Sequence, residues 1–316
     1  MAPSDSKMVA KGYDAVPDDN SKIPSVESVT QPDAATMLAK RVLGHGSFVL
    51  AAVVLIGLIL VAFLAPLLAP HDPLGQDLDR RLIPPVWNEA GTWTHPLGTD
   101  MMGRDYLSRL IYGAQVSLII GFCAMMISGV LGTVMGVCAG YFGGRVDMVI
   151  TFLLTTRLTL PVVMVALALV AVVGGSLQTV ILVLGFLLWD RFTVVMRSAT
   201  MQIRNLEYVK AANAIGCSTR RIIFSEILPN VLGSLLVIAT FEVAHSVLLE
   251  AALSFLGLGV QPPTPSWGLM VAEGKDYMLF DPYLVMLPGF AIFVLVLAIN
   301  LLGDGARDIF APENRN

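Results

Sequence analysis

The chain contains the stretch GAQVSLIIGFCAMMISGVLGTVMGVCAGYFGG between Gly113 and Gly144, 32 residues without one Asp, Glu, Lys or Arg. About 20 apolar residues are enough to cross the hydrocarbon core of a bilayer. Backbone polar groups inside lipid must bond within their own segment, which favours a helix. A transmembrane β-barrel would instead show short alternating segments, and this stretch does not alternate. The stretch therefore predicts a transmembrane helix.

The composition of the whole chain extends this prediction. Of 316 residues, 55% are hydrophobic and 14% are charged, against about 25% charged residues in an ordinary soluble domain. Mean hydropathy is +0.74 and the formal net charge is −4. These values argue against a water-soluble globular enzyme and indicate an all-α polytopic membrane protein.

Further long uncharged or nearly uncharged runs predict five more spans. Met148–Trp189 would be about 63 Å long as one helix, twice the core thickness, so we expect two helices joined at 174–176. Six spans result, with the remaining runs at Ser47–Pro70, Ile227–Leu258 and Pro282–Gly303. The predicted organisation is a disordered cytoplasmic tail (1–40), a first span (41–70), a periplasmic connector (71–112), a five-helix core (113–304) and a cytoplasmic tail (305–316).

The distribution of basic residues supports this topology. With six spans and a cytoplasmic N-terminus, fourteen Lys and Arg residues lie on the cytoplasmic side and five on the other. Cytoplasmic loops carry such an excess of basic residues. We therefore expect a multi-pass membrane protein with both termini in the cytoplasm.

The two predicted outer segments carry few signs of chemistry. In the connector, Leu107, Leu110 and Ile111 have helical spacing and predict a short amphipathic helix on the membrane surface. The rest of the connector is interpreted as solvated. In the second outer segment, 260–281, Trp267 is expected to be an interfacial anchor.

The inner segment at about 198–229 has a more informative pattern. Good helix formers fill Leu206–Ile215, and Gly216 stops that helix. Ser218 can cap a second short helix, Thr219–Ile227. Ala211 and Ala212 leave a low surface that suits docking into a groove of another protein. The alternative is a loop of convenient helix formers without a partner.

Four ionisable residues fall inside predicted spans, and each should face a protein interior or a water-filled cavity. They are Arg157, Glu242, His245 and Glu250. The last three can share a broad helix face, which permits a proton relay or a metal site. A packed or cavity-lining polar stripe is the interpretation we favour.

No catalytic constellation accompanies these residues. The chain has no Walker-type phosphate loop, no GxSxG and no HExxH. The three cysteines lack metal or disulfide spacing. We expect no catalytic, cofactor or metal site in this chain. If the protein performs energy-requiring work, another subunit must supply the energy.

Three segments together resemble the C-type permease subunits of bacterial dipeptide/oligopeptide ABC importers. The resemblance spans about 47–312. It rests on His95–Asp105 with the following LSR, on Glu207–Pro229, and on EAALSFLGLG at 250–259 with QPPTPSWG after it. A C-terminal LGDGARD at 302–308 also fits.

The resemblance implies a type I ABC importer permease fold with a cytoplasmic coupling helix, located in the bacterial inner membrane. It implies a second, B-type permease, two ATPase subunits that bind ATP and Mg²⁺, and a periplasmic or lipid-anchored peptide-binding protein as partners, with no nucleic acid. The implied ATPase contacts are Glu207, Tyr208, Lys210, Ala211, Ala212 and Gly216, with Leu228 and Pro229 in the same motif.

The sequence departs from the family pattern in two regions. Lys210 stands where the loop usually has Glu before the paired alanines. Val194, Phe152 and Thr155 stand where the family tends to have charged residues, and Arg157 is an addition.

Two alternatives to peptide import are kept. One is a related importer for nickel, glutathione or another small solute, and the other is an ion-coupled carrier that uses Glu242, His245 and Glu250.

Overall fold

The computed structural model describes residues 45–310, with the side chains of residues 309 and 310 excepted, and in this part of the chain the fold is helical with two isolated β-bridges. The predicted tail at 1–40 lies outside the described residues. The helices are α2 (Gly46–Phe63), α3 (Ala65–Leu68), η2 (Leu78–Arg80), α4 (Tyr106–Phe142), α5 (Gly144–Thr159), α6 (Val162–Val173), α7 (Leu177–Leu187), α8 (Trp189–Arg204), α9 (Glu207–Ala214), α10 (Thr219–Arg221), η3 (Ile222–Ile227), α11 (Leu228–Phe255), α12 (Trp267–Gly274), η4 (Lys275–Tyr277) and α13 (Tyr283–Phe310).

Five helical segments are long and apolar enough to cross a membrane: α2, α4, 177–204, 219–255 and 283–308. The pair α5 and α6 has the length and composition of a sixth span, bent by 85°. The bend falls at Leu160-Pro161 because a residue that precedes proline is disfavoured in the helical region. The predicted break at Gly174–Ser176 is present, with Gly174 at φ +104° and Ser176 capping α7.

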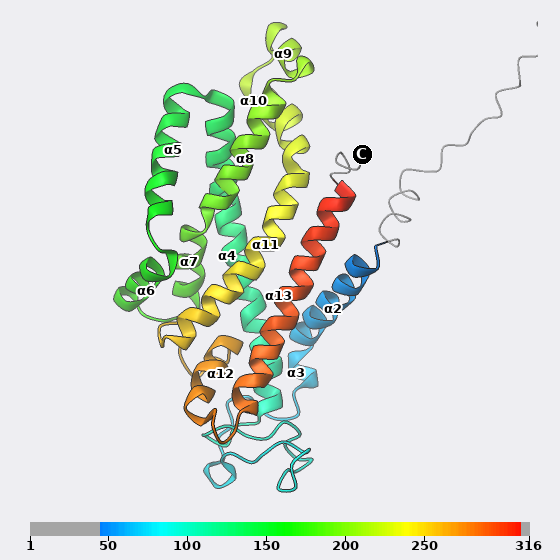
Figure 1. Ribbon diagram of the computed structural model, residues 1–316, viewed down its shortest axis with the longest axis vertical. Helices are drawn as coiled ribbons and strands as arrows, with labels where there is room; N and C mark the ends of the chain where they lie inside the picture. The colour runs from blue at the N-terminus through cyan, green and yellow to red at the C-terminus, as the bar shows by residue number, and fades with distance from the viewer. Residues whose placement is uncertain (1–44, 311–316) are drawn as a thin grey trace, which may run out of the picture.

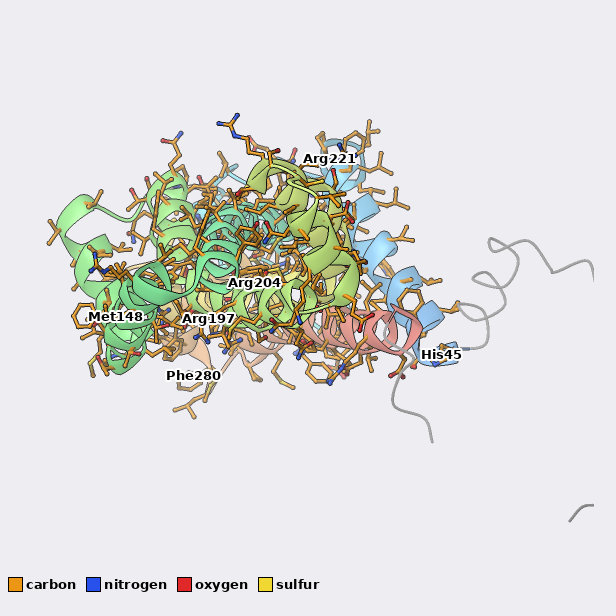
Figure 2. All side chains as sticks on the ribbon, turned by 90° about the horizontal axis from the view of Figure 1, so that it is seen from above. His45, Met148, Arg197, Arg204, Arg221 and Phe280 are labelled. Carbon is orange, nitrogen blue, oxygen red and sulfur yellow. The ribbon has the colours of Figure 1, made fainter. Side chains whose placement is uncertain are left out.

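The long helices run roughly side by side between two polar ends (Figure 1). The loop with α9 protrudes at one end, and the connector 71–105 and α12 lie at the other. Figure 2 looks onto the α9 end, where Met148 and His45 lie on opposite sides of the molecule. We refer to these as the α9 end and the connector end.

Helix α4 differs from the sequence prediction. The expected amphipathic helix at Leu107–Ile111 is the first turns of α4 itself, which runs unbroken for 37 residues, about 55 Å. The side chain of Asp105 caps it by accepting a hydrogen bond from the Ser108 backbone N–H at 2.8 Å. No proline lies near residue 112 and Gly113 stays within the helix, so α4 extends beyond the hydrocarbon core.

A seam of glycines on α4 brings this helix close to α8. A Cβ at Gly132 would lie 2.4 Å from the Trp189 carbonyl oxygen, and one at Gly136 would lie 2.7 Å from the Thr193 carbonyl oxygen. A Cβ at Gly140 would lie 2.7 Å from the Arg197 carbonyl oxygen. Small residues at four-residue spacing let two helix backbones approach closely in a membrane. The α4–α8 pair therefore forms the centre of the bundle.

Candidate functional site

Several contacts hold the α9 loop against the end of the bundle. Val209 is buried in an apolar cluster with Met196 of α8 and Ile222 of η3. Ala212 is partly buried against the same cluster. The Tyr208 hydroxyl accepts a hydrogen bond from Asn230 Nδ2 at 3.1 Å, which ties α9 to α11. The loop is thus held on the bundle by contacts with α8, η3 and α11.

The remaining predicted contact residues form the outer surface of this loop. Glu207, Tyr208, Lys210, Ala211 and Gly216 are exposed. Next to them Ile215 is an apolar side chain that is 80% exposed, which sequence reasoning did not single out. Ala211 therefore lies on the open surface, whereas its neighbour Ala212 packs inward.

The end of α9 follows the prediction, but the next helix does not. Gly216 has φ +83°, a conformation that suits glycine after a helix end. Ser218 then caps α10. The predicted separate helix Thr219–Ile227 is instead the beginning of a continuous helical segment of 37 residues, 219–255, that includes a π-helical portion, η3. Pro229 lies directly after this π-helical portion, where the regular α-helical pattern of α11 begins.

Arg157 is paired inside the bundle. Its Nε and Nη2 donate to the Leu187 carbonyl oxygen at 2.8 and 2.5 Å, and Nη1 lies 3.2 Å from Asp190 Oδ2. Asp190 is buried in the first turn of α8. This pair joins α5 to the junction between α7 and α8, so the unusual arginine has a buried counter-charge.

Glu242 lies at the middle of a second charged group. This buried carboxylate lies 3.0 Å from His245 Nδ1 and 3.8 Å from Arg191 Nη1. Arg191 and His245 are partly exposed, at 50% and 26% of their side chains. The polar side chains of Arg191 and His245 therefore form the outer surface of the group, and the Glu242 carboxylate lies buried beneath them. Arg191, one of the fourteen basic residues that the predicted topology places on the cytoplasmic side, lies inside the helical span 177–204.

Glu250 belongs to a separate group. Its Oε1 accepts hydrogen bonds from the hydroxyls of Ser254 at 2.7 Å and Ser266 at 2.9 Å. Ser266 also caps α12 through the Leu269 N–H. Among the contacts of the described residues, Glu250 thus holds α11 against α12, while Glu242 and His245 pair with each other. A continuous relay through all three residues gains no support.

The connector end carries a buried ionic network that the sequence interpretation missed. Arg104 Nε lies 2.6 Å from Asp100 Oδ2, and Arg109 Nη1 contacts the same oxygen. Both guanidinium groups also reach Glu273 of α12, Arg104 at 3.2 Å and Arg109 at 2.7 Å. The last part of the connector, from Asp100 onward, is therefore folded against α12 and is not solvated, whereas most residues of 71–94 are exposed as expected. The four-residue spacing of Asp100 and Arg104 was the available signal for one of these pairs. The contact of Asp100 with Arg109 and the contacts with Glu273 depend on the tertiary fold.

Trp267 also differs from its predicted role. It is 1% exposed, and its indole Nε1 donates to the Leu110 carbonyl oxygen at 2.8 Å. A Cβ at Gly113 would lie 2.8 Å from the indole ring. Trp267 is therefore wedged between α12 and α4, because the glycine on α4 leaves room for the ring.

Comparison with solved structures defines the class of fold. Two inward-facing structures of the MetNI methionine ABC transporter match the chain with TM-scores of 0.55 and 0.54. Each is 18% identical in sequence; the matches cover 64% of this chain and 97% or 96% of theirs. The chain has the fold of a type I ABC importer permease.

Comparison of sequences then gives the family. Residues 132–316 match the family described as binding-protein-dependent transport system inner membrane component, and residues 37–85 match the N-terminal TM domain of oligopeptide transport permease C. The chain belongs to this family of membrane-spanning ABC importer permeases.

Curated relatives cover most of the chain. The di/tripeptide transport system permease protein DppC of Pseudomonas aeruginosa is 42% identical over 259 residues, 82% of this chain and 86% of that protein. The dipeptide transport system permease protein DppC of Haemophilus influenzae is 38% identical over 82% of this chain and 90% of that protein. The glutathione transport system permease protein GsiD of Pectobacterium atrosepticum is 35% identical over 81% of this chain and 83% of that protein.

Proposed function

We propose that this chain forms half of the translocation pore of an ATP-driven importer for dipeptides and short oligopeptides. The observation that carries the proposal is the exposed α9 surface on a permease fold whose relatives are named for peptide transport. In this proposal the partners are a second permease, two ATPase subunits that bind ATP and Mg²⁺, and a peptide-binding protein. This chain itself hydrolyses no nucleotide.

The α9 surface is the proposed contact with an ATPase subunit. Its exposed residues include apolar Ile215 and Tyr208, small Ala211, and both charges of Glu207 and Lys210. An exposed short helix with small and apolar side chains fits a groove on a partner. Lys210 requires an acidic or neutral counterpart there, because a basic counterpart would repel it.

A route from α9 to the middle of the bundle supports coupling. Val209 anchors α9 on the helical segment 219–255, and this segment carries Glu242 and His245. A displacement of α9 by the ATPases would move that segment as a rigid body. ATP binding can drive transport only by stabilising one of two permease states relative to the other.

Arg191 of α8 and His245 of α11 are the proposed pathway residues. Their partly exposed side chains lie over buried Glu242, and a peptide carries a terminal carboxylate that a guanidinium binds well. Arg157 is proposed to shape the pathway through Asp190 and the α7–α8 junction. Glu250 is proposed to position α12 and not to carry ions.

The exposed apolar face of α5 and α6 is the proposed surface for lipid and the second permease. Phe152, Met164 and Val172 are 68–86% exposed there, and Figure 1 shows α6 projecting sideways from the bundle. An apolar surface of this extent requires lipid or another protein.

We propose that the α9 end faces the cytoplasm. Among the described residues 45–310, the connector end carries five basic and nine acidic residues. The α9 end carries seven basic residues (Arg145, Arg197, Arg204, Lys210, Arg220, Arg221 and Arg307) and five acidic ones (Asp147, Glu207, Glu226, Asp304 and Asp308).

A pull-down and an uptake assay test this proposal together. A tagged chain solubilised in mild detergent is expected to retain a second permease and ATPase subunits, and its deletion to abolish uptake of labelled dipeptides. Loss of glutathione or nickel uptake with intact dipeptide uptake would reassign the substrate. An active chain that purifies without any ATPase would contradict the importer itself and favour an ion-coupled carrier.

A further inference from the structure

Two histidines and an aspartate converge at the connector end, apart from the α9 surface and the charged groups of the spans. Asp105 Oδ1 lies 2.8 Å from His95 Nδ1 and 3.6 Å from His71 Nδ1. One ligand atom from each of the three residues can be chosen so that all lie within 4.8 Å of one another. The two imidazole rings have centroids 4.7 Å apart. Three good metal-ligand groups therefore meet at one point.

The distances suit a small tetrahedral cation. Zinc binds imidazole nitrogen and carboxylate oxygen at about 2.0–2.2 Å, so two of its ligand atoms lie roughly 3.3 Å apart. The separations from Asp105 Oδ1, 2.8 Å to His95 and 3.6 Å to His71, bracket this value. The two histidine nitrogens lie within 4.8 Å of each other, so the imidazoles would turn toward a shared centre on binding the ion.

Asp105 is held in the orientation that a ligand needs. Its Oδ2 accepts hydrogen bonds from the Ser108 N–H at 2.8 Å and the Ser108 hydroxyl at 2.7 Å. The same hydroxyl accepts a hydrogen bond from the His71 N–H at 3.1 Å. Oδ1 is thereby left directed at the histidines. Such outer hydrogen bonds fix the ligands of metal sites.

We propose that His71, His95 and Asp105 bind a zinc ion, with a fourth coordination position open to water or a solute group. Two nitrogen ligands and one oxygen ligand favour zinc over magnesium or calcium. His71 is 38% exposed, which gives an ion in solution access to the site, while His95 and Asp105 are buried.

The ion would join three parts of the chain that are far apart in sequence. His71 begins the connector, His95 lies in its middle, and Asp105 caps α4. Binding would therefore fasten the connector to the end of α4, beside the Arg104–Asp100 network. Local spacing gives no sign of these ligands, which is why the sequence predicted no metal.

Zinc content of the full chain, purified in mild detergent, tests the proposal. His71→Phe keeps a ring against His95 but removes a ligand, and His71→Cys supplies a different zinc ligand at the same place. His45→Gln removes a histidine near α2 as a control. We expect one zinc ion per chain in the wild type, in His71→Cys and in His45→Gln, and background zinc in His71→Phe.

Affinity measurements by competition with a zinc-binding dye extend the test. Ser108→Ala should weaken zinc binding about 10- to 100-fold, because it removes one of the hydrogen bonds that orient Asp105. Equal zinc content and affinity in the wild type and His71→Phe would overturn the proposal. Absence of bound zinc in the wild type under zinc excess would do the same. Both results concern this site and leave the importer assignment unaffected.

Discussion

Three charged groups of the bundle are compensated residue by residue. Arg157 pairs with Asp190, Glu242 lies between His245 and Arg191, and Asp147 accepts two hydrogen bonds from Arg197. A buried charge in a membrane is costly unless it is paired or hydrated. Sequence reasoning expected Arg157 and Glu242 to face a protein interior or a water-filled cavity. It could not name Asp190 and Arg191 as partners, because both lie on another helix, α8.

Breaking the Arg157–Asp190 pair should cost stability. Arg157→Met leaves Asp190 buried without its counter-charge, and loss of one member of a buried pair typically costs about 3–5 kcal/mol. We expect a clear fall in the unfolding temperature of the detergent-solubilised chain. The double variant Arg157→Met/Asp190→Leu should recover most of the loss. A double variant as unstable as the sum of the single variants would show that the two side chains do not act as a pair.

Arg191 belongs to the proposed solute path, and its removal should affect transport more than stability. Arg191→Leu leaves Glu242 with its His245 contact at 3.0 Å. We expect peptide uptake to fall several-fold while the pull-down of ATPase subunits and the unfolding temperature stay near wild type. Lys275→Leu, at the connector end, is the matched loss of an exposed positive charge and should transport normally. Unchanged uptake in Arg191→Leu would remove it from the path.

The elements were predictable in number and kind but not at their ends. Long uncharged runs located the spans, and Gly174 and Gly216 marked real breaks. Helix α4 begins seven residues before the predicted run, and α8 continues past Trp189 to Arg204. Charged residues ended the predicted runs, yet a helix continues through them when their side chains find partners, as Arg109 and Arg197 do.

The glycine seam makes the α4–α8 contact sensitive to one methyl group. At Gly136 an added Cβ would lie 2.7 Å from both Met196 Cβ and the Thr193 carbonyl oxygen, so Gly136→Ala must push α8 away. At Gly289 of α13 an added Cβ has nothing within 4 Å. Gly289→Ala should gain up to about 1 kcal/mol from helix propensity. Thermal unfolding of both variants checks this contrast, and a stabilised Gly136→Ala would contradict the close approach.

The candidate site was predictable in outline only. The pattern of residues 206–216 located α9 and its stop, because local helix propensity and the glycine decide both. It did not separate exposed Ala211 from partly buried Ala212, since that difference depends on the cluster around Val209. The connector network and the His71–His95–Asp105 cluster depend on long-range folding.

At the scale of the whole molecule, the charge difference between the two ends predicts the orientation in the membrane. The α9 end is richer in basic residues and should face the cytoplasm. Single cysteines can be placed at Asn88 in the connector and at Asn213 on α9, after Cys123, Cys138 and Cys217 are replaced. A membrane-impermeant maleimide applied to cells with a permeable outer envelope should label Asn88→Cys and spare Asn213→Cys. The reverse labelling would invert the topology.

The central claim is that α9 links ATP hydrolysis to movement of the bundle. ATP-driven uptake of a labelled dipeptide by the complete complex in proteoliposomes tests it most directly, comparing the wild type with Ala211→Asp. Ala90→Asp is the control, since Ala90 is also exposed but lies at the connector end. We predict that Ala211→Asp inserts and folds normally but loses most ATP-driven uptake, while Ala90→Asp transports like the wild type. Normal uptake by Ala211→Asp would contradict the account.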